Sequence, residues 1–235
     1  MTEISPPPYK EMINYVKVKQ INLEGQRLYE APDGSRTPSV TTILSKTKDM
    51  THLNAWKKRV GEDEAKRITT EAAGVGTAMH NNLERFLTGM ERMPGKNLVH
   101  VQANKMADEI INNGLSEVDE IWGIEQSLYY PGLYSGTTDL VGVYKGKPAI
   151  MDFKQTNKPK KREWVDDYFL QLAAYAMAHN EVYGTDIKEG HIFMCSRNCE
   201  YQQFDLEPSE FEQWCNKWLQ RVEDYYEKYH KYLQG

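Results

Sequence analysis

The chain has 235 residues, of which 40% are hydrophobic and 27% charged, and its formal net charge is -5. This length favours a single well-packed domain, and the acidic balance excludes a protein that coats nucleic acid through its overall charge. Any binding of nucleic acid must therefore come from a local basic patch. The three cysteines are too few and too irregularly spaced for a disulfide framework, a zinc site or an iron–sulfur site.

No stretch of the sequence has the apolar length of a membrane span. The start, MTEISPPPYKE, has neither the basic nor the apolar region of a secretory signal, and it does not resemble an organelle transit segment. We expect a soluble, cytoplasmic protein.

The first 38 residues predict an extended lead-in and a small hairpin. Pro6, Pro7 and Pro8 disfavour helix, whereas residues 15–23 alternate loosely in polarity and residues 26–30 are short and β-like, with Gly25 between them. We assign residues 1–38 to this lead-in, at the start of one domain that covers residues 1–235.

Residues 39–115 predict a helical region that begins at Ser39, a plausible N-cap. Residues 53–60 continue as a basic amphipathic helix with one buried tryptophan, Trp56. Two interpretations of that helix stay open, namely ordinary packing and the lining of an opening for a nucleic-acid strand.

A long helical region over residues 62–87 is expected to be interrupted at Gly74 and Gly76. It places His80 and Glu84 four residues apart on one face. His80 has apolar neighbours, so a core histidine and a functional one are both possible.

Residues 118–206 predict the central sheet and one of its helices. Residues 118–130 give the first strand, in which Glu125 either faces solvent or points to a site. Residues 136–144 and 147–153 then predict an antiparallel hairpin around the turn Lys145-Gly146.

This hairpin carries the most informative charges of the sequence. If Tyr144 pairs with Lys147, Asp139 lies opposite Asp152, and Lys154 shares the face of Asp152. Facing carboxylates destabilise a strand pair unless a cation compensates them, and carboxylate oxygens favour Mg²⁺, Mn²⁺ or Ca²⁺. The competing interpretation is an exposed hairpin with solvated charges.

Two features follow the hairpin. A basic run next to Lys154 either contacts phosphates or forms a solvated loop; it consists of Lys158, Lys160, Lys161 and Arg162. Residues 166–183 then predict an amphipathic helix with Gln171 and Tyr175 on one face, which either support a neighbouring strand or contact nucleic acid. Residues 207–235 predict a final helix with an aromatic stripe.

The ordered set His80, Asp139, Asp152-Phe153-Lys154 and QLAAY at residues 171–175 resembles the RecB-type branch of the PD-(D/E)XK nuclease superfamily. Over about residues 27–178 the chain is most similar to the mitochondrial genome maintenance exonucleases and their phage relatives. The chain departs from these groups in lacking a four-cysteine iron–sulfur cluster and a mitochondrial targeting region. The lack of a targeting region suggests that the protein acts in a bacterial or virus-infected host cell.

The resemblance implies an α/β fold: a restriction-endonuclease-like core whose central mixed β-sheet is flanked by helices, with a helical N-terminal region that shapes an opening for a single strand. It implies that Mg²⁺ or Mn²⁺ is held by His80, Asp139, Asp152 and the backbone carbonyl of Phe153, with Glu84 and Glu125 as possible further support. Lys154 then orients the attacking water and stabilises charge.

The implied function is a metal-dependent DNA exonuclease, a hydrolase that prefers single-stranded DNA or single-stranded ends. Gln171 and Tyr175 support the site or the strand, and the basic run holds the flanking backbone. Two alternatives remain: a flap or structure-specific endonuclease, and a non-catalytic nucleic-acid-binding module on the same fold.

Overall fold

The computed structural model of the protein describes residues 4–23, 26–93, 95 and 97–229. The predicted turn residue Gly25 lies outside this part of the chain. The helices are α1 (Val40–Thr47), α2 (Thr51–Val60), α3 (Glu62–Leu87), α4 (Leu98–Asn113), α5 (Asp166–Tyr183) and α6 (Pro208–Tyr229). The strands are β1 (Lys19–Leu23), β2 (Gln26–Glu30), β3 (Arg36–Pro38), β4 (Val118–Tyr130), β5 (Tyr134–Tyr144), β6 (Lys147–Thr156), β7 (Glu189–Ser196) and β8 (Tyr201–Leu206).

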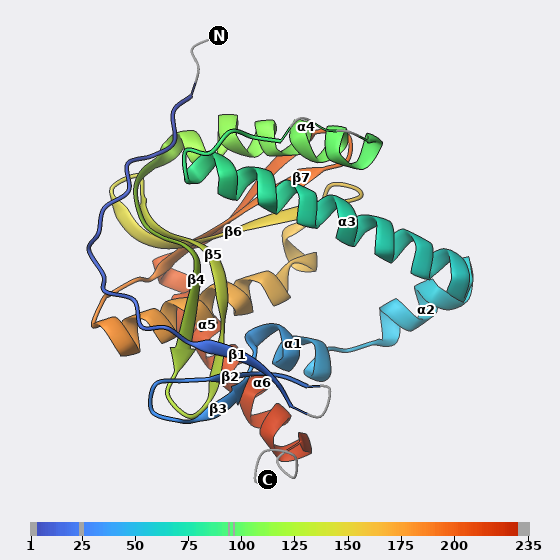
Figure 1. Ribbon diagram of the computed structural model, residues 1–235. Coiled ribbons are helices and arrows are strands. Elements are labelled where there is room, and N and C mark those ends of the chain that lie inside the picture. The colour runs from blue at the N-terminus through green and yellow to red at the C-terminus, as the bar shows by residue number, and fades with distance from the viewer. Residues whose placement is uncertain (1–3, 24–25, 94, 96, 230–235) are drawn as a thin grey trace.

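The central sheet has the order β4-β5-β6-β7-β8, in which β6 and β7 are parallel and the other neighbours are antiparallel. Helices α3 and α4 cover one face, and α5, backed by α6, covers the other (Figure 1). The predicted α/β class, with a mixed sheet flanked by helices and a helical N-terminal region, is confirmed.

The hairpin of β5 and β6 has the predicted register. Tyr144 pairs with Lys147, and the turn residues Lys145 and Gly146 have φ values of 49° and 80°. Positive φ at both central positions matches the right-handed twist of the flanking strands. The turn therefore sets which side chains of the two strands face each other.

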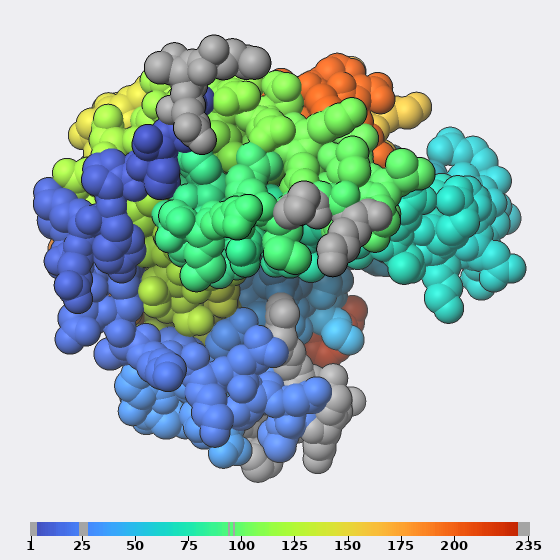
Figure 2. Space-filling model, turned by 45° about the horizontal axis from the view of Figure 1, so that its top comes forward, coloured from blue at the N-terminus to red at the C-terminus, as the bar shows by residue number. Residues whose placement is uncertain are grey.

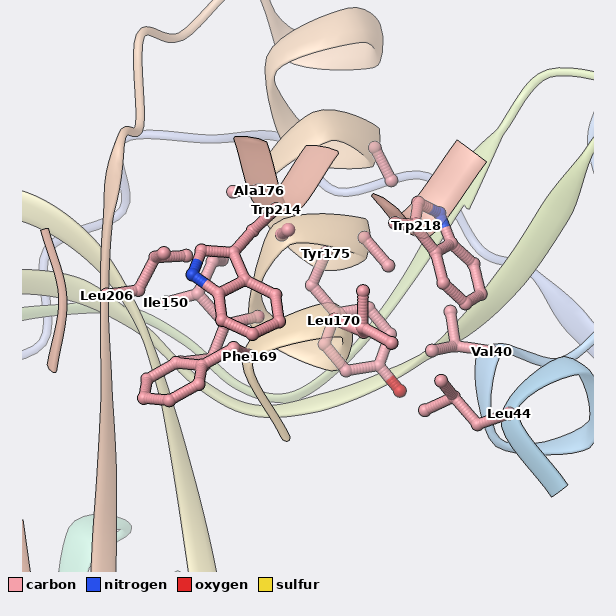
Figure 3. Packing of buried hydrophobic residues seen from close by; sticks show 14 of the residues in the cluster. Val40, Leu44, Ile150, Phe169, Leu170, Tyr175, Ala176, Leu206, Trp214 and Trp218 are labelled. Atoms are coloured by element: carbon pink, nitrogen blue, oxygen red, sulfur yellow. The ribbon is translucent and has the colours of Figure 1, made fainter. Parts of the chain in front are cut away.

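Apolar residues fill both faces of the sheet. On the side of α3 and α4, Met79 and Met106 pack with Met151 and Phe193. On the other side, Trp214 of α6 lies 5.1 Å from Phe169, measured between ring centroids (Figure 3). The two cores hold the strands of the sheet between helices that cannot shift freely.

The helix α1 begins as predicted, because the Ser39 side chain accepts a hydrogen bond from the Thr42 N–H at 3.0 Å. It docks against α5 and α6, and Figure 3 shows Val40 and Leu44 on the side of Trp218. Among the described residues, no helix combines the length and apolarity needed to cross a membrane.

Two helical predictions were wrong. The helix α3 runs without interruption through Gly74 and Gly76, since tertiary packing outweighs the cost of about 1 kcal/mol for each glycine. The helix α2 buries no residue, and Trp56 is only half-buried, because α2 and the start of α3 project from the edge of the molecule (Figure 2). The amphipathic stripe of α2 therefore lacks the partner that core packing would need.

The N-terminal lead-in is extended, as predicted, and it runs along the outer strand of the sheet. The backbone N–H of Ile121 donates to the Pro8 carbonyl at 2.9 Å, and the Lys10 N–H donates to the Ile121 carbonyl at 2.8 Å. The predicted small hairpin is extended to a three-stranded sheet by β3, which pairs with β2. The three residues of β3 were too few to show a strand pattern in the sequence.

Candidate active site

The candidate site lies where β5 and β6 separate. Their backbone pairing ends at Leu140 and Met151, one position before Asp139 and Asp152. Beyond this point, the Oδ2 atom of Asp139 accepts a hydrogen bond of 2.7 Å from the backbone N–H of Phe153. The carboxylate thus replaces the backbone partner that an unbroken sheet would supply, so Asp139 is held in the gap between the strands.

The orientation of the Phe153 carbonyl group follows from the same contact. In a β-strand the N–H and C=O groups of one residue point to the same edge. Because its N–H is directed at Asp139, its carbonyl oxygen also faces the gap between β5 and β6. This is the direction that a metal-ligating carbonyl requires.

Asp152 and Lys154 form a buried ion pair on β6. The Nζ atom of Lys154 contacts Oδ2 of Asp152, and the two side chains are 19% and 3% exposed. Burial raises the pKa of Asp152 to about 6, although Lys154 opposes the rise. Burial also opposes the charge of Lys154, but Asp152 and Asp139 outweigh it and raise the pKa of the ammonium group.

His80 reaches the site from α3. Its Nδ1 atom lies 3.4 Å from Oδ1 of Asp139, and its ring packs edge-on against Phe153 at 6.0 Å between centroids. Burial by itself lowers the pKa of His80, but the Asp139 carboxylate outweighs burial and raises it. The same pairing overcomes burial at Asp139, whose pKa is lowered.

Glu125 takes a clearer place in the site than its sequence suggested. Its neighbours Ile124 and Gln126 pair with Leu140 and Thr138, so Glu125 lies opposite Asp139 in the register of β4 and β5. Its φ of 47° is in the left-handed region, which is uncommon for a residue other than glycine. Although Glu125 is exposed, partial desolvation of its carboxyl group and the Asp139 charge raise the pKa of Glu125 to about 7.

A potential metal-binding group is formed by three of these side chains. One ligand atom from each of His80, Glu125 and Asp139 lies within 4.8 Å of the others. An imidazole nitrogen and two carboxylate oxygens suit a divalent cation such as Mg²⁺ or Mn²⁺. Asp152 lies beside this group but is engaged by Lys154, so the protein itself supplies part of the compensation that we had expected from a metal.

Glu84 is exposed on α3, one helical turn beyond His80. Its charge contributes to the raised pKa of Glu125. The structure therefore places it at the margin of the site, where it adds negative charge.

Gln171 and Tyr175 lie beneath the site on α5. They are 8% and 2% exposed, and Nε2 of Gln171 lies 3.4 Å from the Tyr175 hydroxyl. A Cβ atom added to Gly136 would lie 2.8 Å from the Tyr175 ring, so β5 approaches this ring closely. Their burial favours support of β5 over direct contact with a strand of nucleic acid.

The basic run after β6 divides into two parts. Arg162 donates to the Asp205 carbonyl at 2.9 Å, pairs with Glu210, and lies over the Phe169 ring, so its guanidinium is used within the fold. Lys158 and Lys160 instead line a surface pocket next to β6. Lys161 is exposed and lies 5.4 Å from the centre of the Trp164 ring.

Comparison with known proteins gives sequence relatives that share one name. Mitochondrial genome maintenance exonuclease 1 of Mus musculus is 31% identical over 205 residues, which cover 81% of this chain and 59% of the relative. The Homo sapiens protein of the same name is 29% identical over 205 residues, covering 81% and 58%. The chain thus spans less than two thirds of the length of these relatives.

A candidate exonuclease from Eubacterium rectale is a similar solved structure, with a TM-score of 0.47 and 12% identity over 66% of this chain and 64% of that chain. A structural similarity of this extent supports no conclusion about function. No family model matches the chain. The chain is thus similar in sequence to mitochondrial genome maintenance exonuclease 1 over 205 residues, and this similarity accompanies the ordered site residues on a mixed sheet.

Proposed function

We propose that this chain is a divalent-metal-dependent deoxyribonuclease that digests DNA from an end and prefers single strands. The observation that carries the proposal is the group formed by His80, Glu125 and Asp139 beside the Asp152–Lys154 ion pair. A binding module has no need of a buried lysine next to clustered carboxylates. The sequence relatives, which are named as exonucleases, support the same activity.

The site residues have distinct roles in the proposed reaction. His80, Glu125, Asp139, Asp152 and the Phe153 carbonyl would hold Mg²⁺ or Mn²⁺, which supplies Lewis acidity and a lowered pKa of bound water. Asp139 is fixed for this role by the Phe153 N–H.

Lys154 supplies a positive charge where negative charge develops on the scissile phosphate. Its ammonium group is held in place by Asp152 on one side, and it lies 5.1 Å from the centre of the Tyr168 ring. This preorganisation means that little rearrangement is required as the phosphate approaches.

The preference for single strands is proposed from the shape of the N-terminal half. The projecting helix α2 presents Lys57, Lys58 and Arg59 in its last turn, and it carries no buried residue. A basic, unpacked helix beside the helix that supplies His80 suits contact with a flexible phosphate backbone. We further propose a single nuclease domain, since α1 packs on α5 and α6 and thereby joins the N-terminal part to the core.

The test is a digestion assay with DNA labelled at either end, in single-stranded, double-stranded and circular forms. Wild-type protein is expected to shorten linear single strands in Mg²⁺ or Mn²⁺, to spare circles, and to be inactive in EDTA. Asp152→Ala and Lys154→Ala should each abolish cleavage. Activity that survives both substitutions, or no metal-dependent cleavage, contradicts the proposal, and cutting of circles supports an endonuclease instead.

A further inference from the structure

A pocket of about 380 Å³ lies directly beyond the catalytic strand end. Its wall joins the end of β6 to the turn before α5, and its main residues are Gln155, Thr156, Lys158, Lys160, Trp164 and Tyr168. Lys154 connects the pocket to the candidate site, because its Nζ atom lies 5.1 Å from the centre of the Tyr168 ring. A ligand that reaches Lys154 can therefore extend into the pocket.

The pocket is cationic although the chain as a whole is acidic. Its lining residues include two lysines and no carboxylate. Within the described residues, neither Lys158 nor Lys160 has an ion-pair partner, whereas the nearby Asp167 is paired with Lys48 at 2.7 Å. Burial and the neighbouring Lys48 lower the pKa of Lys160. The chemistry of this wall favours an anionic ligand.

Trp164 gives the pocket an aromatic wall. The residue is 58% exposed, although tryptophan is normally among the more buried residues. Its backbone N–H donates to the Lys161 carbonyl at 3.0 Å, so a tight turn holds the indole at the rim. An exposed aromatic face next to lysines is the combination that binds a nucleobase and its phosphate in single strands.

Gln155 adds an unused acceptor at the floor. Its Oε1 atom is buried and has no hydrogen-bond partner among the described residues. A buried polar atom without a partner is costly, and a ligand N–H group would satisfy it. Nucleobases carry such donors, whereas the phosphodiester groups of a DNA backbone carry none.

We propose that this pocket binds the nucleotide next to the scissile phosphate, with its base stacked on Trp164 and its phosphate held by Lys158 and Lys160. The proposal rests on the nuclease function proposed above, because the pocket is defined by its position next to Lys154. It adds a substrate subsite that selects a flexible, unstacked strand, since a base within a duplex cannot present its face to the indole.

The first test measures equilibrium binding of a labelled single-stranded oligonucleotide in EDTA, where no metal-dependent cleavage occurs. Trp164→Ala is expected to weaken binding at least about fivefold, the lower end for loss of one stacked base, and Trp164→Phe should restore most of it. Tyr9→Ala is the matched control, because Tyr9 is 60% exposed on the lead-in beside β4. Equal melting temperatures will establish that the variants are folded.

A set of oligonucleotides with one abasic position each identifies the stacked base. At one position, loss of the base should weaken binding to the wild type and leave binding to Trp164→Ala unchanged. Binding of Trp164→Ala that equals wild type, or an abasic effect equal in both proteins at every position, overturns the subsite. Failure of the wild type to bind any oligonucleotide overturns it as well.

The lysines are tested by salt dependence. Lys158→Gln with Lys160→Gln should reduce the slope of log affinity against log salt by about 0.7 for each phosphate that the protein no longer neutralises. An unchanged slope contradicts their role. The two proposals can fail separately. If the wild type cleaves DNA but Trp164→Ala leaves binding unchanged, only the subsite is contradicted. If Trp164→Ala weakens binding but the wild type cleaves no DNA, the nuclease function is contradicted.

Discussion

Glu125→Gln tests the metal site through stability, without any substrate. The pKa of Glu125 is raised from 4.5 to about 7, which corresponds to at most about 3 kcal/mol at about 1.4 kcal/mol per pKa unit. Because the side chain is exposed, screening by solvent reduces the expected effect to about 1 kcal/mol. For a chain of this size, that is a shift of about 2–4 °C in melting temperature.

The sign of the effect follows from the direction of the shift. A carboxyl group with a raised pKa favours the folded state while it is protonated, and this contribution is lost as the pH rises from its ordinary pKa through about 7. Glutamine has no such loss. In EDTA, Glu125→Gln should therefore match the wild type near pH 5 and be more stable than the wild type near pH 8.

Added metal should make the wild type more stable than Glu125→Gln near pH 8. Mg²⁺ or Mn²⁺ at about 100 times its dissociation constant should stabilise the wild type by about 2.7 kcal/mol, and it should stabilise Glu125→Gln less, because one oxygen ligand is weakened. Thermal unfolding is followed by circular dichroism. It measures the stability of both proteins, with and without metal, at both pH values. Destabilisation of Glu125→Gln near pH 8 in EDTA would contradict the raised pKa of Glu125, and equal stabilisation of both proteins by metal would contradict its role as a ligand.

Three further predictions concern packing and charge, and urea unfolding checks each. Gly136→Ala should cost about 1–3 kcal/mol, since its Cβ atom would lie 2.8 Å from the Tyr175 ring; an unchanged midpoint would show that the ring can move aside. Gly74→Ala, where a Cβ atom meets nothing within 4 Å in the middle of α3, should add about 1 kcal/mol, and destabilisation there would argue against an open helix face. Lys154→Met should cost about 3–5 kcal/mol at neutral pH, because it leaves Asp152 buried without its partner. This cost should shrink as the pH falls towards about 6, because Asp152 without Lys154 takes up its proton at a higher pH than the wild-type carboxyl does, and a cost that is independent of pH would count against the ion pair.

The hairpin and its charges could be predicted because they depend on local rules. The turn Lys145-Gly146 determines the register, and alternation then places Lys154 on the face of Asp152. The contact between His80 and Asp139 joins α3 to β5. It was expected only from a resemblance to known nucleases, because no local pattern reports a contact between residues so far apart in the chain.

Glu125 and Trp56 show where local rules fail. Glu125 has a left-handed φ of 47°, and periodicity along β4 carries no signal for such an irregularity. Trp56 was expected to be buried, with packing and the lining of a strand opening both open for its helix, but an amphipathic pattern shows only which residues share a face. The rest of the fold decides whether another element covers that face. Here α2 projects from the edge of the molecule, and none of its residues is buried.

The most direct test of the proposed metal site is the position of Mn²⁺ in a crystal of the wild-type protein, located by anomalous scattering at the manganese edge. We predict a peak bounded by the side chains of His80, Glu125 and Asp139, near the carbonyl of Phe153. A Mn²⁺ ion bound elsewhere, or no ion at concentrations that support DNA cleavage, would contradict the proposed site.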